Sequence, residues 1–131
     1  MPIEYRIDPE RRIVLATARG VLTADDLFSY QRSVWSASGL AGFDELVDLG
    51  GVTDVPQLSA LRARDLAVVA ARMDDPAVAT RLAIVAPADF AYGLARMYAT
   101  HRETQEHGRK QVRVFRDMAE AVAWLEEREG R

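Results

Sequence analysis

Hydrophobic and polar positions alternate along the chain in blocks whose spacing predicts nine secondary-structure elements. The first two blocks are β-branched runs on either side of a Pro-Glu-Arg segment, which is typical of a β-hairpin. Later blocks switch between short apolar runs and runs with a three- to four-residue apolar period, so strands and helices alternate. The predicted strands are 3–8, 12–20, 43–52, 80–87 and 110–115, and the predicted helices are 22–35, 60–73, 88–108 and 116–129.

Details within these blocks refine the prediction. Thr23 with Asp26 three residues later is a capping-box pattern at the start of the first helix. The run 80–87 is almost entirely apolar, which indicates a strand covered on both faces. The third strand is expected to end at Gly50 and Gly51. The apolar stripe predicted for the third helix consists of Phe90, Leu94, Met97 and His101.

Together these signals predict an α/β fold formed by one domain over residues 1–131. The element order is ββαβαβαβα, with a central, five-stranded, mostly parallel sheet, an opening hairpin and four helices. A chain of this length is about the size of one compact domain.

Composition and charge narrow the range of partners. The net charge is −3 and the estimated isoelectric point is 5.4, which argues against nucleic acid as a partner. The sequence contains no cysteine, which excludes disulfides and thiolate chemistry. Because no apolar run approaches the ~20 residues of a membrane span and the charged N-terminus is unlike a secretory signal, we expect a cytoplasmic protein.

Candidate catalytic residues do not assemble into a known pattern. His101 and His107 are six residues apart, whereas metal chelation on one helix face needs a spacing of four. Acidic residues near the third strand, including Asp44, Glu45 and Asp48, fit ordinary turn and cap chemistry. We therefore expect no enzymatic activity, no metal site and no cofactor. The alternative of a general base at His101 lacks a partner that the sequence identifies.

Four stretches carry a resemblance to a known group of proteins. They are "GVLTADDL", "ELVDLGGVTDV", "RLAIVAPADFAYGLARMY" and "VRVFRDMAEAVAWL", and together they cover nearly the whole chain. The chain resembles small bacterial STAS/SEC14-like domains, which are related to the anti-sigma-factor antagonist domains. The resemblance implies the fold predicted above and a non-enzymatic regulatory or protein-interaction role.

In signalling members of that group, a serine in an Asp-Ser-Ser-Gly segment after the third strand is phosphorylated. Here Pro56 takes the aspartate position, and Gln57 and Leu58 take the two serine positions. Ser59 follows one residue late, where a helix N-cap is the simpler interpretation. The resemblance thus predicts a partner-binding surface, without the phosphoserine switch, formed by Asp54, Gln57, Ser59 and Arg62.

The SEC14 side of the resemblance implies an alternative function. A small apolar or lipid-like ligand would lie between the sheet and the third helix, near Tyr92, Met97 and His101. Plain core packing of these side chains is the competing interpretation. A homodimer is also expected, because open sheets have edges that need protection.

Overall fold

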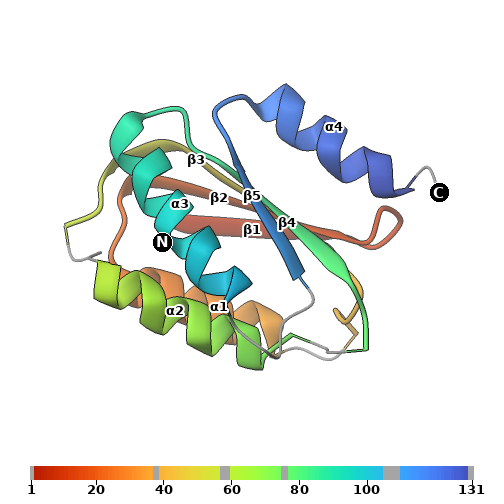
Figure 1. The fold of residues 1–131 in the computed structure, drawn as a ribbon. Coiled ribbons are helices and arrows are strands. Elements are labelled where there is room, and N and C mark those ends of the chain that lie inside the picture. Colours follow the sequence, from red (N-terminus) through yellow and green to blue (C-terminus); the bar gives the residue numbers. More distant parts are fainter. Residues whose placement is uncertain (1, 37–38, 57–59, 75–76, 105–109, 130–131) are drawn as a thin grey trace.

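The computed structural model describes residues 2–36, 39–56, 60–74, 77–104 and 110–129, and it has the predicted element order (Figure 1). The strands are β1 (Ile3–Asp8), β2 (Ile13–Val21), β3 (Asp44–Asp54), β4 (Thr80–Val85) and β5 (Lys110–Phe115). The helices are α1 (Ala24–Trp35), α2 (Ala60–Arg72), α3 (Asp89–Glu103) and α4 (Met118–Glu129).

The five strands form one sheet in the order β1-β2-β3-β4-β5. The β1 and β2 strands pair antiparallel, and every later neighbour pairs in parallel. The prediction of a mostly parallel sheet with an opening hairpin is therefore confirmed. Strands β2, β3 and β4 lie inside the sheet, and the nearly all-apolar sequence of β4 fits that internal position.

The two glycines that were expected to close the third strand do not end it. The β3 strand continues through Gly50 and Gly51, and the pairing register shifts beside them, from Thr17 opposite Asp48 to Arg19 opposite Gly51. This step uses two residues of β2 and three of β3, which is a β-bulge. A Cβ at Gly51 would come within 3.0 Å of Arg19 Cγ, so glycine allows the strand to pass close to its neighbour.

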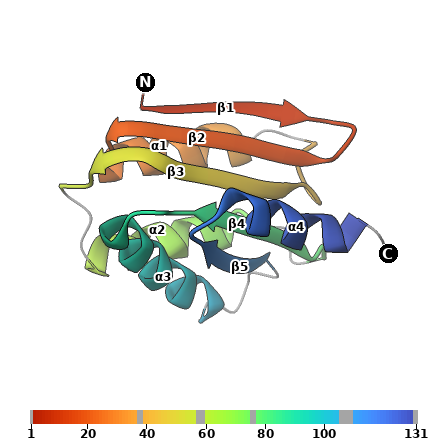
Figure 2. The same ribbon diagram turned by 90° about the horizontal axis from the view of Figure 1, so that it is seen from above.

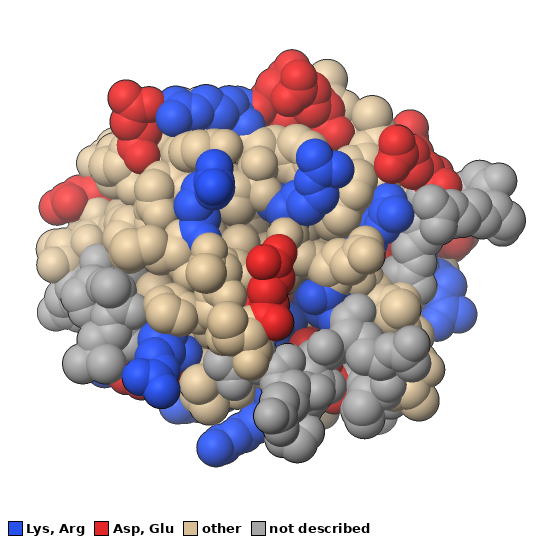
Figure 3. All heavy atoms as spheres, viewed as in Figure 1, with Lys and Arg blue, Asp and Glu red and all other residues tan. Residues whose placement is uncertain are grey.

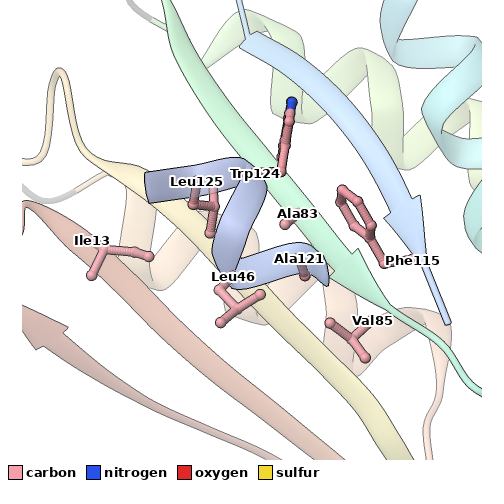
Figure 4. Packing of buried hydrophobic residues seen from close by; sticks show 8 residues of the cluster. All are labelled: Ile13, Leu46, Ala83, Val85, Phe115, Ala121, Trp124 and Leu125. Carbon is pink, nitrogen blue, oxygen red and sulfur yellow. The ribbon is translucent and has the colours of Figure 1, made fainter. Parts of the chain in front are cut away.

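Of the four helices in the described part of the chain, α4 covers one face of the sheet, and α1, α2 and α3 lie on the other side (Figures 1 and 2). Under α4, large side chains fill the space (Figure 4). The rings of Phe115 and Trp124 have centroids 5.7 Å apart, and the guanidinium of Arg81 lies 4.8 Å from the Trp124 ring centroid. The buried cluster comprises Ile13, Leu46, Ala83, Val85, Phe115, Ala121, Trp124 and Leu125.

On the opposite side, α1 begins with the predicted capping box between Thr23 and Asp26. Helix α2 packs against α1 and α3, with Leu66 buried against Ala24 and Phe28 of α1. On this side of the sheet, α2 therefore packs against both α1 and α3.

The buried stripe of α3 differs from the predicted one. Phe90 is 43% exposed, and the buried residues of the helix are Ala91, Ala95, Ala99 and Arg102. The difference is a rotation of the helix about its axis. Alanines allow the helix backbone to approach its neighbours closely, so the larger side chains that define the apparent stripe lie at its margins.

The surface carries charges of both signs. On the face shown in Figure 3, lysine and arginine side chains are interspersed with aspartate and glutamate side chains. Among the described residues, no helix has the length and apolar character needed to span a membrane.

Candidate functional site

An apolar pocket of about 90 Å³ lies between the sheet and the three helices on its α1–α3 side. Helix α1 contributes Leu27, α2 contributes Leu66, and α3 contributes Leu94. The sheet supplies the floor, from the small side chains of β2 to the branched ones of β4. The lining residues are Ile3, Ala16, Ala18, Leu22, Leu27, Tyr30, Gln31, Glu45, Val47, Leu49, Val52, Val55, Ala63, Leu66, Leu82, Ile84, Ala91, Leu94, Ala95 and Tyr98.

The pocket exists because small residues occupy positions that face it from every side. Ala16 and Ala18 of β2 lie opposite Ala63 of α2 and Ala91 and Ala95 of α3 in the lining, and all five are buried. An engineered apolar cavity of roughly 150 Å³ in another protein stays dry and binds benzene. The pocket here is somewhat smaller, so it suits a small ring or a short branched chain.

One buried carboxylate interrupts the apolar lining. Glu45 of β3 is 4% exposed, and its Oε2 accepts hydrogen bonds from Tyr30 Oη at 2.6 Å and Trp35 Nε1 at 3.1 Å. Lys110 Nζ of β5 lies 3.5 Å from Glu45 Oε1, and it also lies 3.9 Å from the Trp35 ring centroid. Glu45 therefore ties α1 to β3 and β5. Lys110 stands behind the carboxylate and does not line the pocket.

Two tyrosines accompany Glu45 at this polar end of the pocket. Burial is the main cause that raises the pKa of Tyr30, and the neighbouring Glu45 carboxylate raises it further. Burial also raises the pKa of Tyr98. Both phenols therefore keep their protons around neutral pH. Tyr30 donates its proton to Glu45.

A second buried ion pair lies at the end of α3. Arg102 Nη2 approaches Asp74 Oδ1 at 3.1 Å and Oδ2 at 3.0 Å, and Arg102 is 5% exposed. Within the described part of the chain, Arg102 Nε and Nη1 lack hydrogen-bond partners. This pair lies outside the pocket lining, so we assign it to the anchoring of α3.

The three residues predicted for the ligand pocket do not line it. Tyr92 instead packs its ring against Arg116, whose Cζ lies 4.2 Å from the ring centroid. Met97 and His101 are partly buried on α3 but are also absent from the lining. Of the predicted α3 stripe, Leu94 does line the pocket, and the other α3 lining residues are Ala91, Ala95 and Tyr98.

The residues predicted to bind a protein partner are only partly visible. Gln57 and Ser59 lie outside the described residues. Asp54 is exposed, and its Oδ1 accepts a hydrogen bond from the Val55 N–H at 2.8 Å. Arg62 forms an ion pair with Asp25 at 3.6 Å and lies over the Phe28 ring, 5.2 Å from its centroid.

Sequence reasoning treated Glu45 as one of several scattered acidic residues. One available signal was its place inside a predicted strand, because a charged side chain that such a strand buries has to be paired. Its partners on α1 and β5 could not be identified from periodicity. Across the described ranges, no group of three or more histidine and acidic side chains is arranged to hold a metal ion.

No protein-family model matches this chain, and no curated protein matches its sequence. The structure is similar to a crystal structure described as an uncharacterized protein from the DUF3478 family with a SpoIIAA-like fold, from Shewanella loihica PV-4. That match has a TM-score of 0.60 and 18% sequence identity, and it covers 94% of this chain and 93% of the other. The chain therefore has a SpoIIAA-like α/β fold, the fold of the STAS and anti-sigma-factor antagonist domains.

Proposed function

We propose that the chain is a binding module whose pocket takes a small, mostly apolar ligand, and that it acts by binding and not by catalysis. The observation that carries this proposal is the pocket itself, which three helices and the sheet line mostly with apolar side chains. Concave, mostly apolar sites with a few convergent polar groups are typical of small-molecule binding. A lipid with a long chain exceeds the volume of about 90 Å³, so the proposal concerns a compact ligand.

Alanine positions in the lining provide a direct test. Ala95→Leu would place a larger side chain in the pocket, whereas Ala123→Leu makes the same change at an exposed site on α4. Native mass spectrometry after mild purification should show a co-purified ligand on the parent protein and on Ala123→Leu, but not on Ala95→Leu. If the parent protein carries no ligand, titration with toluene followed by protein NMR gives the same comparison.

Equal binding by the two variants would contradict the proposed pocket. So would toluene binding that shifts only resonances of residues on the α4 side of the sheet. Circular dichroism of Ala95→Leu establishes that the variant is folded before its loss of binding is interpreted.

A second candidate function is a regulatory protein interaction through Asp54, Gln57, Ser59 and Arg62. The SpoIIAA-like fold supports a STAS-like regulatory or interaction module. The exposure of Asp54, next to the start of α2, favours this surface. A double charge reversal of Asp54 and Arg62 should abolish capture of a partner from the native host. Partner contacts confined to the opposite sheet edge would contradict the assignment.

Homodimerisation and a cytoplasmic location remain predictions.

A further inference from the structure

We infer that two copies of the chain associate through their β1 strands, which pair antiparallel about a two-fold axis at Tyr5. The inference is independent of the proposed pocket function, because it concerns an edge of the sheet. Strand β1 is the last strand on its side, and no strand in the described part of the chain pairs with its outer edge (Figure 2). Such an edge is a template for a further strand.

The backbone groups that face this edge belong to alternate residues of β1. The Pro2 carbonyl accepts a hydrogen bond from the Arg19 N–H at 2.9 Å, so Pro2 directs its backbone toward β2. In an antiparallel ladder, residues bonded to one neighbour alternate with residues whose N–H and C=O point the other way. Because the β1–β2 register is regular, the outward groups are those of Ile3, Tyr5 and Ile7.

The side chains of β1 also alternate in character. Tyr5 and Ile7 are 50% and 43% exposed, and the Tyr5 ring lies on the α1 side, with its centroid 6.2 Å from that of Tyr30. Glu4 and Arg6 point to the opposite face and are exposed. Within the described ranges, neither of these charged side chains forms an ion pair.

This sequence is complementary to its own reverse. When Tyr5 lies opposite Tyr5 of a second copy, Ile3 lies opposite Ile7, and Glu4 lies opposite Arg6. Two-fold symmetry makes each of these pairs occur twice. The outward backbone groups then bond to one another. The charged pairs occupy the positions without hydrogen bonds, where opposing side chains are closest and opposite charges are stabilising.

Neighbouring registers bring like charges together. An axis at Arg6 places this residue opposite its own copy and places Glu4 opposite Asp8. An axis at Glu4 places that carboxylate opposite its own copy. Like charges directly opposite one another are destabilising, so the charges of β1 favour the axis at Tyr5.

The expected dimer is weak. One short strand from each copy forms the contact, and interfaces that bury less than about 1,200 Å² are typical of transient complexes. We therefore expect a dimer that dissociates on dilution. Its exposed charge pairs should also make it weaker as the salt concentration rises.

Charge reversal tests both the partner and the register. In sedimentation velocity over a series of concentrations, the parent protein should show a monomer–dimer equilibrium. Glu4→Arg alone and Arg6→Glu alone each place like charges at both pairs and should weaken association about tenfold. A mixture of these two variants should associate as the parent does, because every cation then faces an anion. Arg64→Glu, at an exposed site on α2, is the matched control and should dimerise normally.

Amide hydrogen exchange tests the strand pairing itself. At concentrations that favour the dimer, the amides of Ile3, Tyr5 and Ile7 should become protected, whereas those of Glu4 and Arg6 should not change. A parent protein that stays monomeric into the millimolar range overturns the inference. So does a dimer that neither charge reversal weakens, or a mixture of the two variants that does not associate. Protection of these amides only by a different protein also overturns it. All of these outcomes leave the proposed pocket function standing.

Discussion

The two faces of the sheet differ in how their side chains fill space. Consecutive β4 residues alternate between the faces, so Ala83 and Val85 pack under α4 while Leu82 and Ile84 face the pocket side. Under α4, Trp124 and Phe115 fill the gap between helix and sheet (Figure 4). On the other face α3 buries only alanines and Arg102. One sheet thus supports a filled core and a pocket.

Polar groups follow the same division. On the α4 side, Arg81 donates to the Trp124 carbonyl at 2.7 Å and Arg113 lies over the rings of Phe115 and Trp124. These cations lie around the margin of a filled core. On the pocket side, the Glu45 carboxylate lines the space itself. Burying a carboxylate is costly unless it is paired, and the bonds from Tyr30, Trp35 and Lys110 offset that cost. The two faces therefore differ in how they treat a buried charge: the α4 side keeps its cations beside the core, whereas on the pocket side the buried Glu45 is paired within the lining.

The largest expected contrast comes from making the same substitution on both faces. Ala83→Leu inserts three carbons into the filled core, where Ala83 is fully buried, and should lower the free energy of unfolding by about 3 kcal/mol. Ala95→Leu points into the pocket and should cost less than about 1 kcal/mol. Urea denaturation of the two variants measures both values. Equal costs would remove the distinction between the faces.

A smaller loss of stability is expected when the hydrogen bond between Tyr30 and Glu45 is removed. Tyr30→Phe removes the hydrogen bond of 2.6 Å to Glu45 and should lower the free energy of unfolding by about 2 kcal/mol at neutral pH. Because the folded-state pKa of Tyr30 is raised, mainly by burial and then by Glu45, its contribution is fully present below the unfolded pKa of about 10.

Above that pH the unfolded chain loses the phenol proton while the folded chain keeps it, so stability falls as pH rises. Urea denaturation at about pH 7 and about pH 11 should therefore show a smaller alkaline loss for Tyr30→Phe than for the parent protein. Identical alkaline losses would show that Tyr30 keeps an ordinary pKa in the folded state.

The smallest effect concerns the surface of α3. Gly93 is exposed in the helix interior, and an added Cβ would meet nothing within 4 Å. Gly93→Ala should therefore raise the free energy of unfolding by about 0.5 to 1 kcal/mol and leave ligand binding unchanged. Thermal denaturation with and without toluene measures both quantities. A destabilised Gly93→Ala would indicate a close contact that the structure lacks.

The element order and sheet class were predictable because they depend on local periodicity. The apolar run 80–87 predicts an internal strand, and β4 lies between β3 and β5. The rotation of α3 was not predictable in the same way. Large residues such as Phe90 and Met97 dominate a periodicity argument, whereas close packing selected Ala91 and Ala95 for the interior.

The candidate site was the least accessible to prediction. Glu45 acquires its meaning from Tyr30 and Trp35 on α1 and from Lys110 on β5, which lies 65 residues away along the chain. Contacts between residues so far apart along the chain leave no pattern in the local sequence around Glu45. The bulge at Gly51 was missed for a related reason, because a glycine that ends a strand and one that admits a close neighbour look alike in a sequence.

The most direct measurement of the central claim is a set of intermolecular nuclear Overhauser effects between bound toluene and the protein methyl groups. The account predicts contacts with Leu82, Ile84 and Ala95, which line the pocket, and none with Ala83 or Val85 under α4. Contacts with Ala83 or Val85, or an absence of contacts with the pocket methyls at saturating toluene, would contradict it.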